Sequence, residues 1–245
     1  MSLIIYEGPS EYDGAPTVAI ATFKSKNRKT GTMAQIWIMR ADVEPHDAQR
    51  TGDDASVCGA CPLRPLAVKL AKLEGEKRAQ CYVVVVKAPL SVYRAYKRGS
   101  YDYATPEQMR ALSQGGMVRL GAYGDPASVP YDVWERMGVG TGEFGHTGYT
   151  HGWLRPATFD RRILGITMLS VDPVSERDDA PLLPSGARSF RVLGPNESPR
   201  ADEIECPSSR GVQCAKCGLC AGTNKQAKNI VIKAHGGATP NAARG

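Results

Sequence analysis

The sequence predicts an α/β protein: a partial (β/α) barrel or an open parallel sheet, with an N-terminal β-hairpin and a C-terminal cysteine-rich metal segment. Three observations lead to this prediction. Short apolar strands alternate with helical segments over most of the chain, which is typical of parallel βαβ units. The 245 residues are 42% hydrophobic, enough to bury a core. The seven cysteines fall into two groups, as metal ligands do where thiols stay reduced.

The N-terminal part predicts a hairpin followed by a loop-rich segment. Residues Thr17–Phe23 and Ala34–Met39 are rich in strand-forming residues, and the basic, turn-forming KSKNRKTGT lies between them. A short helix is expected over Leu66–Leu73. The unbroken valines of Cys81–Lys87 predict a strand that is buried on both faces.

From residue 89 onward, helices and strands are expected to alternate. The expected helices are Leu90–Lys97, Pro106–Gln114, Pro130–Met137, Pro156–Arg162 and Pro173–Asp179. The expected strands are Met117–Tyr123, Gly145–His151, Leu164–Asp172, Arg188–Gly194 and Asn229–Gly236. This pattern divides the chain into a hairpin with a basic loop (1–57), a barrel-like core (58–200), a metal segment with a closing strand (201–236) and a disordered tail (237–245).

Polar side chains cluster at the ends of several expected strands. Because parallel strands bring their carboxyl ends to one edge, we expect these side chains to meet there. Asp125, His151 and Ser170 are the candidate catalytic residues, and Tyr149 and Thr150 the candidate cofactor-binding residues. Each also has a structural interpretation, because Gly-Asp-Pro forms turns and Ser-Val-Asp-Pro caps helices.

The C-terminal cysteines have the spacing C-P-x6-C-x2-C-x2-C. They are Cys206, Cys214, Cys217 and Cys220. A closely wound loop of this kind lets three thiolates reach three iron corners of a [4Fe–4S] cubane, with the remote cysteine as the fourth ligand. Four thiolates also suffice for tetrahedral zinc. The sequence therefore predicts either a [4Fe–4S] cluster or Zn at this segment.

The second group is Cys58-x2-Cys61-x19-Cys81, which offers three thiolates. A cubane held by three cysteines leaves one iron open for a substrate or for S-adenosylmethionine. A structural zinc would instead borrow a ligand such as His46. A third interpretation is that the two groups share a single cluster.

The net charge of +6 is concentrated in part in one loop. Lys24, Lys26, Arg28 and Lys29 form a basic run that could contact nucleic-acid phosphates, although a solvated loop is the simpler interpretation. No apolar run approaches the length of a membrane span, and the N-terminus lacks signal-peptide features. We therefore expect a cytoplasmic protein whose partner is a small-molecule substrate or nucleic acid, with no membrane partner.

Six sequence blocks, NRKTG, CGACPLRP, CYV, RLGAYGDP, GYTH and CPSS with CxxCxxC, occur in this order. In these blocks the chain resembles a family of cysteine-rich phage and prophage proteins over most of its length. More distantly, its strand ends and Cys81–Tyr82 resemble radical-SAM-type barrels, whose compact CX3CX2C signature is absent. The resemblance implies an iron–sulfur α/β barrel encoded by a bacteriophage or mobile element, and implies no particular reaction.

The chain is also similar to the queuine tRNA-ribosyltransferase barrels and their phage DNA-modifying relatives. That similarity implies a zinc site at Cys214, Cys217, Cys220 and His235, and Asp125 or Asp172 as a nucleophile toward a glycosidic carbon. Three hypotheses follow. The first is an iron–sulfur enzyme with a cluster held by the three-cysteine group at the mouth of a partial (β/α) barrel and a second metal at the four-cysteine group. The others are a zinc-binding nucleic-acid or assembly module without catalysis, and a transglycosylase-like base-modifying enzyme with structural zinc.

Overall fold

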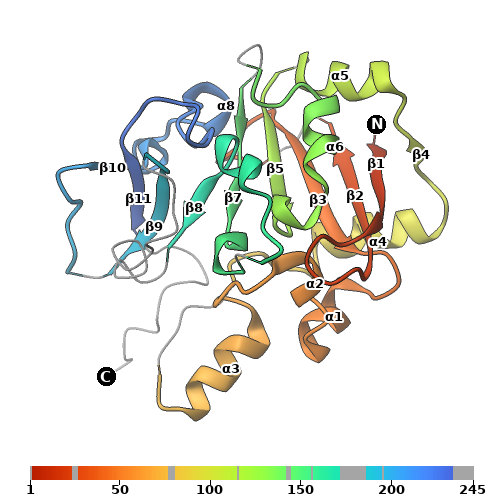
Figure 1. Ribbon diagram of the computed structural model, residues 1–245, viewed down its shortest axis with the longest axis horizontal. Helices are drawn as coiled ribbons and strands as arrows, with labels where there is room; N and C mark the ends of the chain where they lie inside the picture. The colour runs from red at the N-terminus through yellow and green to blue at the C-terminus, as the bar shows by residue number, and fades with distance from the viewer. Residues whose placement is uncertain are drawn as a thin grey trace.

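The computed structural model describes residues 2–23, 27–76, 81–114, 116–141, 145–155, 157–171, 186–194 and 196–233. Within them the protein is a mixed α/β structure with two β-sheets that lie side by side (Figure 1). The strands are β1 (Ser2–Pro9), β2 (Pro16–Thr22), β3 (Ala34–Arg40), β4 (Asp102–Tyr103), β5 (Val118–Tyr123), β6 (His146–Thr147), β7 (Tyr149–Thr150), β8 (Met168–Ser170), β9 (Ser189–Leu193), β10 (Glu203–Glu205) and β11 (Asn229–Lys233).

Short helices connect and cover these strands. The α-helices are α1 (Pro45–Thr51), α2 (Ala55–Cys58), α3 (Pro65–Leu73), α4 (Ala88–Lys97), α5 (Pro106–Gln114), α6 (Tyr131–Arg136) and α8 (Cys214–Cys217). The 3-10 turns are η1 (Pro126–Ser128), η2 (Gly152–Leu154), η3 (Arg161–Gly165) and η4 (Pro207–Arg210). No helix within the described ranges is long and apolar enough to cross a membrane.

The first sheet is mixed, with the strand order β4-β1-β2-β3-β5-β6. Strand β2 pairs antiparallel with β1 and β3, and the other neighbours are parallel. The predicted hairpin is confirmed as β2–β3, in register from Thr17 opposite Arg40 to Thr22 opposite Gln35. The sequence patterns did not predict β1 or β4, which extend the sheet beyond the hairpin.

The second sheet is parallel throughout, with the order β10-β11-β9-β8-β7. Only Gly148 separates β6 of the first sheet from β7 of the second, so one continuous segment joins the two sheets. The Gly148 carbonyl accepts a hydrogen bond from the Met168 amide (2.9 Å). The α/β class predicted from the sequence is therefore confirmed, and the partial barrel stays a prediction.

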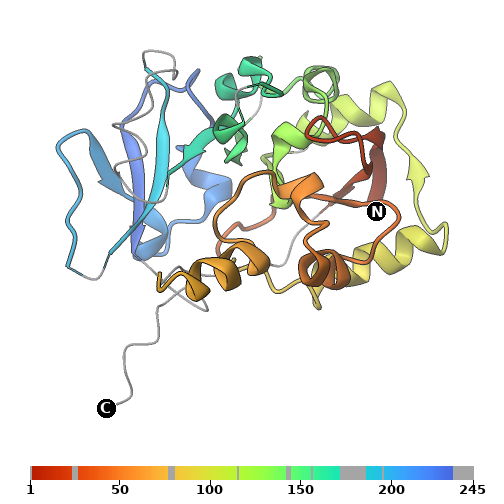
Figure 2. The ribbon, with the colours of Figure 1, turned by 60° about the horizontal axis from the view of Figure 1, so that its bottom comes forward.

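The mixed sheet is covered on both faces. On one face, α5 and α6 contribute Met109, Leu112 and Trp134 to a core that includes Ile36 and Leu120 of the sheet. On the other face, α4 packs its apolar residues against β1, β2 and β3. When the molecule is viewed after a 60° rotation, α1, α3 and α4 lie along one side of this sheet and α5 and α6 along the other (Figure 2). The face of the sheet that α4 covers also borders the cavity described below.

Two local predictions were wrong. Cys81–Lys87 forms no strand: residues 81–84 are irregular, and a turn then leads into α4. Val85 is buried, whereas Val84 and Val86 are about half exposed, so the segment has one apolar contact face and no neighbouring strand. The helix expected over Pro156–Arg162 is instead the later 3-10 turn η3.

Several predictions concern residues outside the described ranges. These are the basic residues Lys24 and Lys26, the strand-end residues Asp172 and His235, the helix over Pro173–Asp179 and the tail 237–245. The strand pairings β3–β5 and β9–β11 cross the domain boundaries expected near residues 57 and 200.

Candidate metal centre

Both cysteine motifs contain the same local structure, a single helical turn that ends at a glycine. Helix α2 ends at Cys58 and is followed by Gly59 (φ 59°), and α8 ends at Cys217 and is followed by Gly218 (φ 63°). A side chain is strained at such positive φ, so glycine lets the chain reverse direction directly after a cysteine. The reversal brings the next cysteine of each motif back toward the first.

Three backbone contacts hold the C-terminal cysteine segment in place, through Cys206, Cys214 and Cys220. The Cys206 amide donates to the Val231 carbonyl of β11 (2.7 Å). The Cys214 amide donates to the carbonyl of Lys29 in the basic loop (3.0 Å). The Cys220 carbonyl accepts from the Gly148 amide, where the two sheets join (3.1 Å). The cysteine segment is therefore attached to both sheets and to the basic loop.

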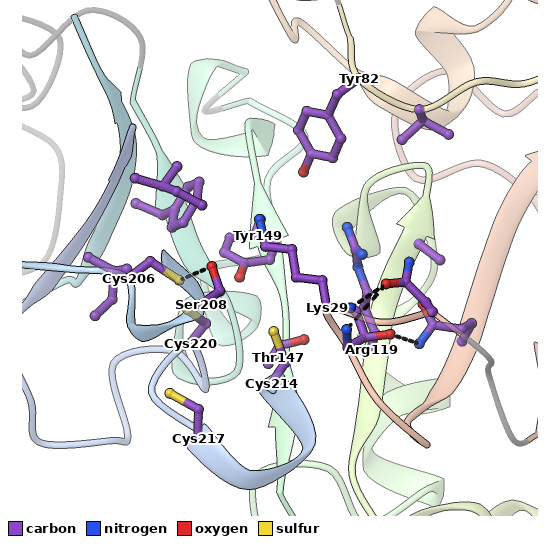
Figure 3. A pocket seen from close by; sticks show the side chains of 18 of the residues that line it. Lys29, Tyr82, Arg119, Thr147, Tyr149, Cys206, Ser208, Cys214, Cys217 and Cys220 are labelled. Atoms are coloured by element: carbon purple, nitrogen blue, oxygen red, sulfur yellow. Dashed lines mark hydrogen bonds between the residues drawn. The ribbon is translucent and has the colours of Figure 1, made fainter. Parts of the chain in front are cut away.

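These four cysteines, which we call the four-thiol group, line one cavity of about 330 Å³. Figure 3 shows them gathered at one end, with Lys29 and Arg119 beside them and Tyr82 at the opposite end. The cavity extends over both sheets, because alternate strand residues face it. They are Gln35 and Trp37 of β3, Arg119 of β5, Thr147 of β6, Tyr149 of β7, Phe190 of β9, and Ile230 and Ile232 of β11.

Burial and nearby cations act in opposite directions on the four-thiol group. Burial raises the pKa of Cys220 to about 12, and a hydrogen bond from the Tyr149 hydroxyl opposes this shift. Burial also raises the pKa of Cys214, against the charges of Arg119 and Lys29. Burial lowers the pKa of Lys29, while the neighbouring thiols raise it. Two cations therefore lie where they stabilise thiolates, the form in which cysteine binds metal.

We call Cys58, Cys61 and Cys81 the three-thiol group. Cys61 and Cys81 are close enough to Cys58 for their charges to raise its pKa. The Cys61 amide donates to the Cys58 carbonyl (3.2 Å), and the Cys81 amide donates to the carbonyl of Leu63 in the same loop (2.9 Å). Burial raises the pKa of Cys58 well above its usual value, and the charges of Asp54, Cys61 and Cys81 raise it further. Burial raises the pKa of Cys81 to about 11.

Asp54 is the acidic neighbour of the three-thiol group. Its side chain is 1% exposed and pairs through Oδ1 with the Arg64 guanidinium (2.9 Å). Its Oδ2 is buried and has no hydrogen-bond partner among the described residues. Arg64 also donates to the carbonyls of Gly52 (2.9 Å) and Gly59 (3.2 Å). This one side chain therefore connects the two ends of α2 through hydrogen bonds. His46, the ligand considered from the sequence, is on the separate helix α1.

Zinc and a cubane require different distances between their thiolate sulfurs. Within the described part of the chain, no three His, Cys, Asp or Glu side chains are arranged to share a single metal ion. Tetrahedral zinc bound at about 2.3 Å would bring its thiolate sulfurs to about 3.8 Å from one another. A cubane is bound by one thiolate at each iron corner and therefore needs a wider arrangement.

Three of the five strand-end candidates, Asp125, Thr150 and His151, lie together, and their contacts are hydrogen bonds to backbone amides. The Asp125 carboxylate accepts hydrogen bonds from the amides of Ala127 (2.9 Å) and His151 (2.7 Å). Thr150 Oγ1 accepts one from the Gly152 amide (2.8 Å). Burial raises the pKa of Asp125, and these hydrogen bonds oppose the shift. Asp125 therefore connects the ends of β5 and β7 and caps η1.

Of the other two strand-end candidates, Tyr149 lines the cavity and Ser170 does not. Ser170 is buried, and its carbonyl accepts a hydrogen bond from Trp153 Nε1 (2.9 Å). Tyr149 points into the cavity and borders Cys220, whereas Thr150, the next residue along β7, faces away. Of the five strand-end candidates, Tyr149 alone is among the residues that line this cavity.

Sequence reasoning missed Arg119 and Tyr82 as site residues. Arg119 lies within β5. The only sequence signal that could have identified it is the alternation of side chains between the two faces of a strand. Its charge acts on Cys214 at one end of the cavity and on Cys81 and Tyr82 at the other. Tyr82 was assigned to a buried strand. Lys29 was identified only as a possible nucleic-acid contact, and its side chain lines the cavity.

Comparisons of the chain with protein-family models, with curated proteins and with solved structures found no match.

Proposed function

We propose that this protein is an iron–sulfur protein, with a [4Fe–4S] cluster bound by Cys206, Cys214, Cys217 and Cys220 at one end of a substrate-sized cavity. The observation that carries the proposal is that all four thiols line this single cavity. The spacing Cys214-x2-Cys217-x2-Cys220, with Cys206 as a remote fourth thiol, supports a [4Fe–4S] centre over zinc.

The surrounding residues fit such a centre. Lys29 and Arg119 supply positive charge beside sulfurs that become negative on binding iron. Tyr149 donates a hydrogen bond to the sulfur of Cys220, a contact that tunes the potential of a cluster ligand. Apolar neighbours such as Leu219 and Ile230 pack beside Cys206 and Cys220 and limit access of water.

We further propose that the protein is an enzyme acting on a molecule bound in the cavity. A cubane bound by four thiolates has no open iron site, so it would supply electron transfer or structural support. The cavity is large enough for a small ligand. The three-thiol group is near its other end through Cys81, next to Tyr82 of the cavity wall. A second cluster at that group stays a prediction, which the experiment below tests.

The zinc-binding nucleic-acid module is the second candidate, and one observation favours it. The carbonyls of Arg28, Lys29 and Thr30 accept hydrogen bonds from Gln213, Cys214 and Ala215, so the basic loop and the cysteine segment are one unit. A metal-ordered basic surface of this kind is typical of nucleic-acid contacts. The transglycosylase hypothesis is less favoured, because Asp125 caps backbone amides and does not line the cavity.

Metal analysis after anaerobic purification tests the proposal. We expect brown protein with about four irons and about four acid-labile sulfides for each filled cubane. Cys217→Ser should lose the iron and the sulfide of one cluster, about four of each. Lys216→Ala, a non-thiol change next to Cys217 on α8, should retain them. Any iron that remains in Cys217→Ser and disappears on Cys81→Ser belongs to the three-thiol group. Colourless protein containing zinc and no sulfide would overturn the iron–sulfur assignment.

A further inference from the structure

Apart from the cysteine thiols, the charged side chains on the cavity walls are all cations. Lys29, Lys87 and Arg119 line the cavity, and no Asp, Glu or His is among its described lining residues. Lys29 lies beside the cysteines, in the loop whose carbonyl accepts from the Cys214 amide. Lys87 and Arg119 are the other two cations on the cavity walls. A cavity of this composition attracts an anion and repels a cation.

Arg119 has an unused donor. Its Nε is buried and has no hydrogen-bond partner among the described residues. A guanidinium group offers parallel N–H donors that match two oxygens of a phosphate. An anionic group in the cavity would therefore satisfy a donor that the fold leaves unpaired.

Aromatic and apolar side chains form the rest of the walls. Trp37 is held by a hydrogen bond from its Nε1 to Thr22 Oγ1 (2.9 Å), and Tyr149 packs edge-on against Phe190, with ring centroids 4.7 Å apart. Tyr82 is 49% exposed at the end opposite the cysteines, where its hydroxyl points toward the cavity (Figure 3).

The rim of the cavity is apolar as well. Val84 is 52% exposed on one side, and Val212 is 40% exposed on the cysteine segment. Large apolar side chains exposed around a cavity are typical of a ligand-binding site. Asn27, Thr147 and Ser208 add polar groups along the walls, suited to a sugar or to the edge of a base.

We propose that the cavity binds a nucleoside phosphate, with the phosphate at Arg119 and Lys87 and the base among the aromatic walls. This inference rests on the proposed function in one respect: the bound molecule is the substrate on which the cluster-containing enzyme acts. The same chemistry is present in a free nucleotide and in a nucleotide within a nucleic-acid strand. The experiment distinguishes these two sources.

Binding is measured by calorimetry on the anaerobically purified full chain. The probes are adenosine 5′-monophosphate, guanosine 5′-monophosphate, adenosine, ribose 5-phosphate and a short single-stranded oligonucleotide. We expect at least one of the two monophosphates to bind at least tenfold more tightly than either adenosine or ribose 5-phosphate. An oligonucleotide that binds more tightly than both monophosphates identifies a strand as the source, and the opposite order identifies the free nucleotide.

Variants test the two cations. Arg119→Gln should weaken binding of the preferred monophosphate at least tenfold, and Lys87→Gln, at the exposed start of α4, should weaken it severalfold. Arg136→Gln on α6, which is not among the residues lining the cavity, is the matched control and should bind normally. Lys87→Gln also provides a test if Arg119→Gln does not fold.

The outcomes separate this inference from the proposed function. Iron and sulfide are measured on the same samples. A cluster-containing protein that binds neither monophosphate, or binds adenosine as tightly, overturns the nucleotide inference and leaves the iron–sulfur assignment intact. Nucleotide binding by a chain that lacks iron supports the cavity assignment and overturns the iron–sulfur proposal. Unchanged binding in both Arg119→Gln and Lys87→Gln overturns the phosphate site.

Discussion

The two cysteine groups share a helical turn and a glycine, but they differ in the charges around them. The four-thiol group borders a cavity and has Lys29 and Arg119 beside it. The three-thiol group has the buried carboxylate of Asp54 beside it, and its cation, Arg64, is already paired with that carboxylate. A thiolate is stabilised by cations and destabilised by a nearby carboxylate. The four-thiol group is therefore the better prepared of the two to bind metal as thiolates.

The groups also differ in how they contribute to the fold. Cys58 packs against both apolar clusters of the mixed sheet, while Cys217 borders the cavity. The amide of Asp125 at the end of β5 donates to the Val57 carbonyl, which anchors α2 to the sheet. Cysteine spacing alone does not separate a thiol that packs as a small apolar side chain from one that faces a cavity.

The largest expected effect is at Arg64. Arg64→Ala leaves Asp54 buried and unpaired, and should lower the free energy of unfolding by about 3–5 kcal/mol. Lys216→Ala on α8, between Cys214 and Cys217, should change the free energy of unfolding by no more than about 0.5 kcal/mol. Urea unfolding of the metal-free proteins measures both. If Arg64→Ala costs less than about 1 kcal/mol, the ion pair does not hold the three-thiol loop and the contrast between the groups weakens.

The second effect concerns the reactivity of Cys81. Its pKa of about 11, against an ordinary value of 9.0, reduces the thiolate fraction near neutral pH about 100-fold. In metal-free folded protein, alkylation of Cys81 should be slower by about that factor than in the chain unfolded in urea. Because burial disfavours the charged form, the rate should rise about tenfold per pH unit and level off only near the raised pKa. Peptide mass spectrometry of alkylated samples gives the rate, and equal rates in the folded and unfolded chain would contradict the burial of this thiol.

Much of the fold follows from local sequence signals. Helix α5 has the predicted bounds, because Thr105-Pro106-Glu107 starts a helix: Thr105 Oγ1 accepts the Gln108 amide (3.2 Å). The β2–β3 hairpin and strands β5, β8, β9 and β11 were predictable in the same way from short apolar runs between turn residues. Strands β4 and β10, two and three residues long, depend on pairing with strands distant in sequence, and no local pattern marks them.

The site was less predictable, because its members come together through long-range packing. The spacing of Cys214, Cys217 and Cys220 is a local signal, and these thiols line one cavity; that they bind a metal together stays a prediction. Which cations lie beside them depends on the contact between residues 28–30 and 213–215, far apart in sequence. Asp125 lies near His151, although β5 and β7 belong to different sheets, and the loops after these strands determine which backbone amides its carboxylate accepts from.

The smallest effect is the difference in stability between two Cys→Ser substitutions in metal-free protein. Cys58→Ser places a hydroxyl between two apolar clusters and should cost about 1–3 kcal/mol, whereas Cys217→Ser beside the cavity should cost no more than about 0.5 kcal/mol. Cys58→Ala is the matched control, because it removes the sulfur without adding a polar group, and it should recover part of the loss. Urea midpoints measured without metal isolate this packing contribution from metal binding. Equal costs at the two positions would mean that Cys58 is no more part of the core than Cys217. The three-thiol group would then be as free of a packing role as the four-thiol group, and the difference between them would rest on the surrounding charges: Asp54 beside one group, and Lys29 and Arg119 beside the other.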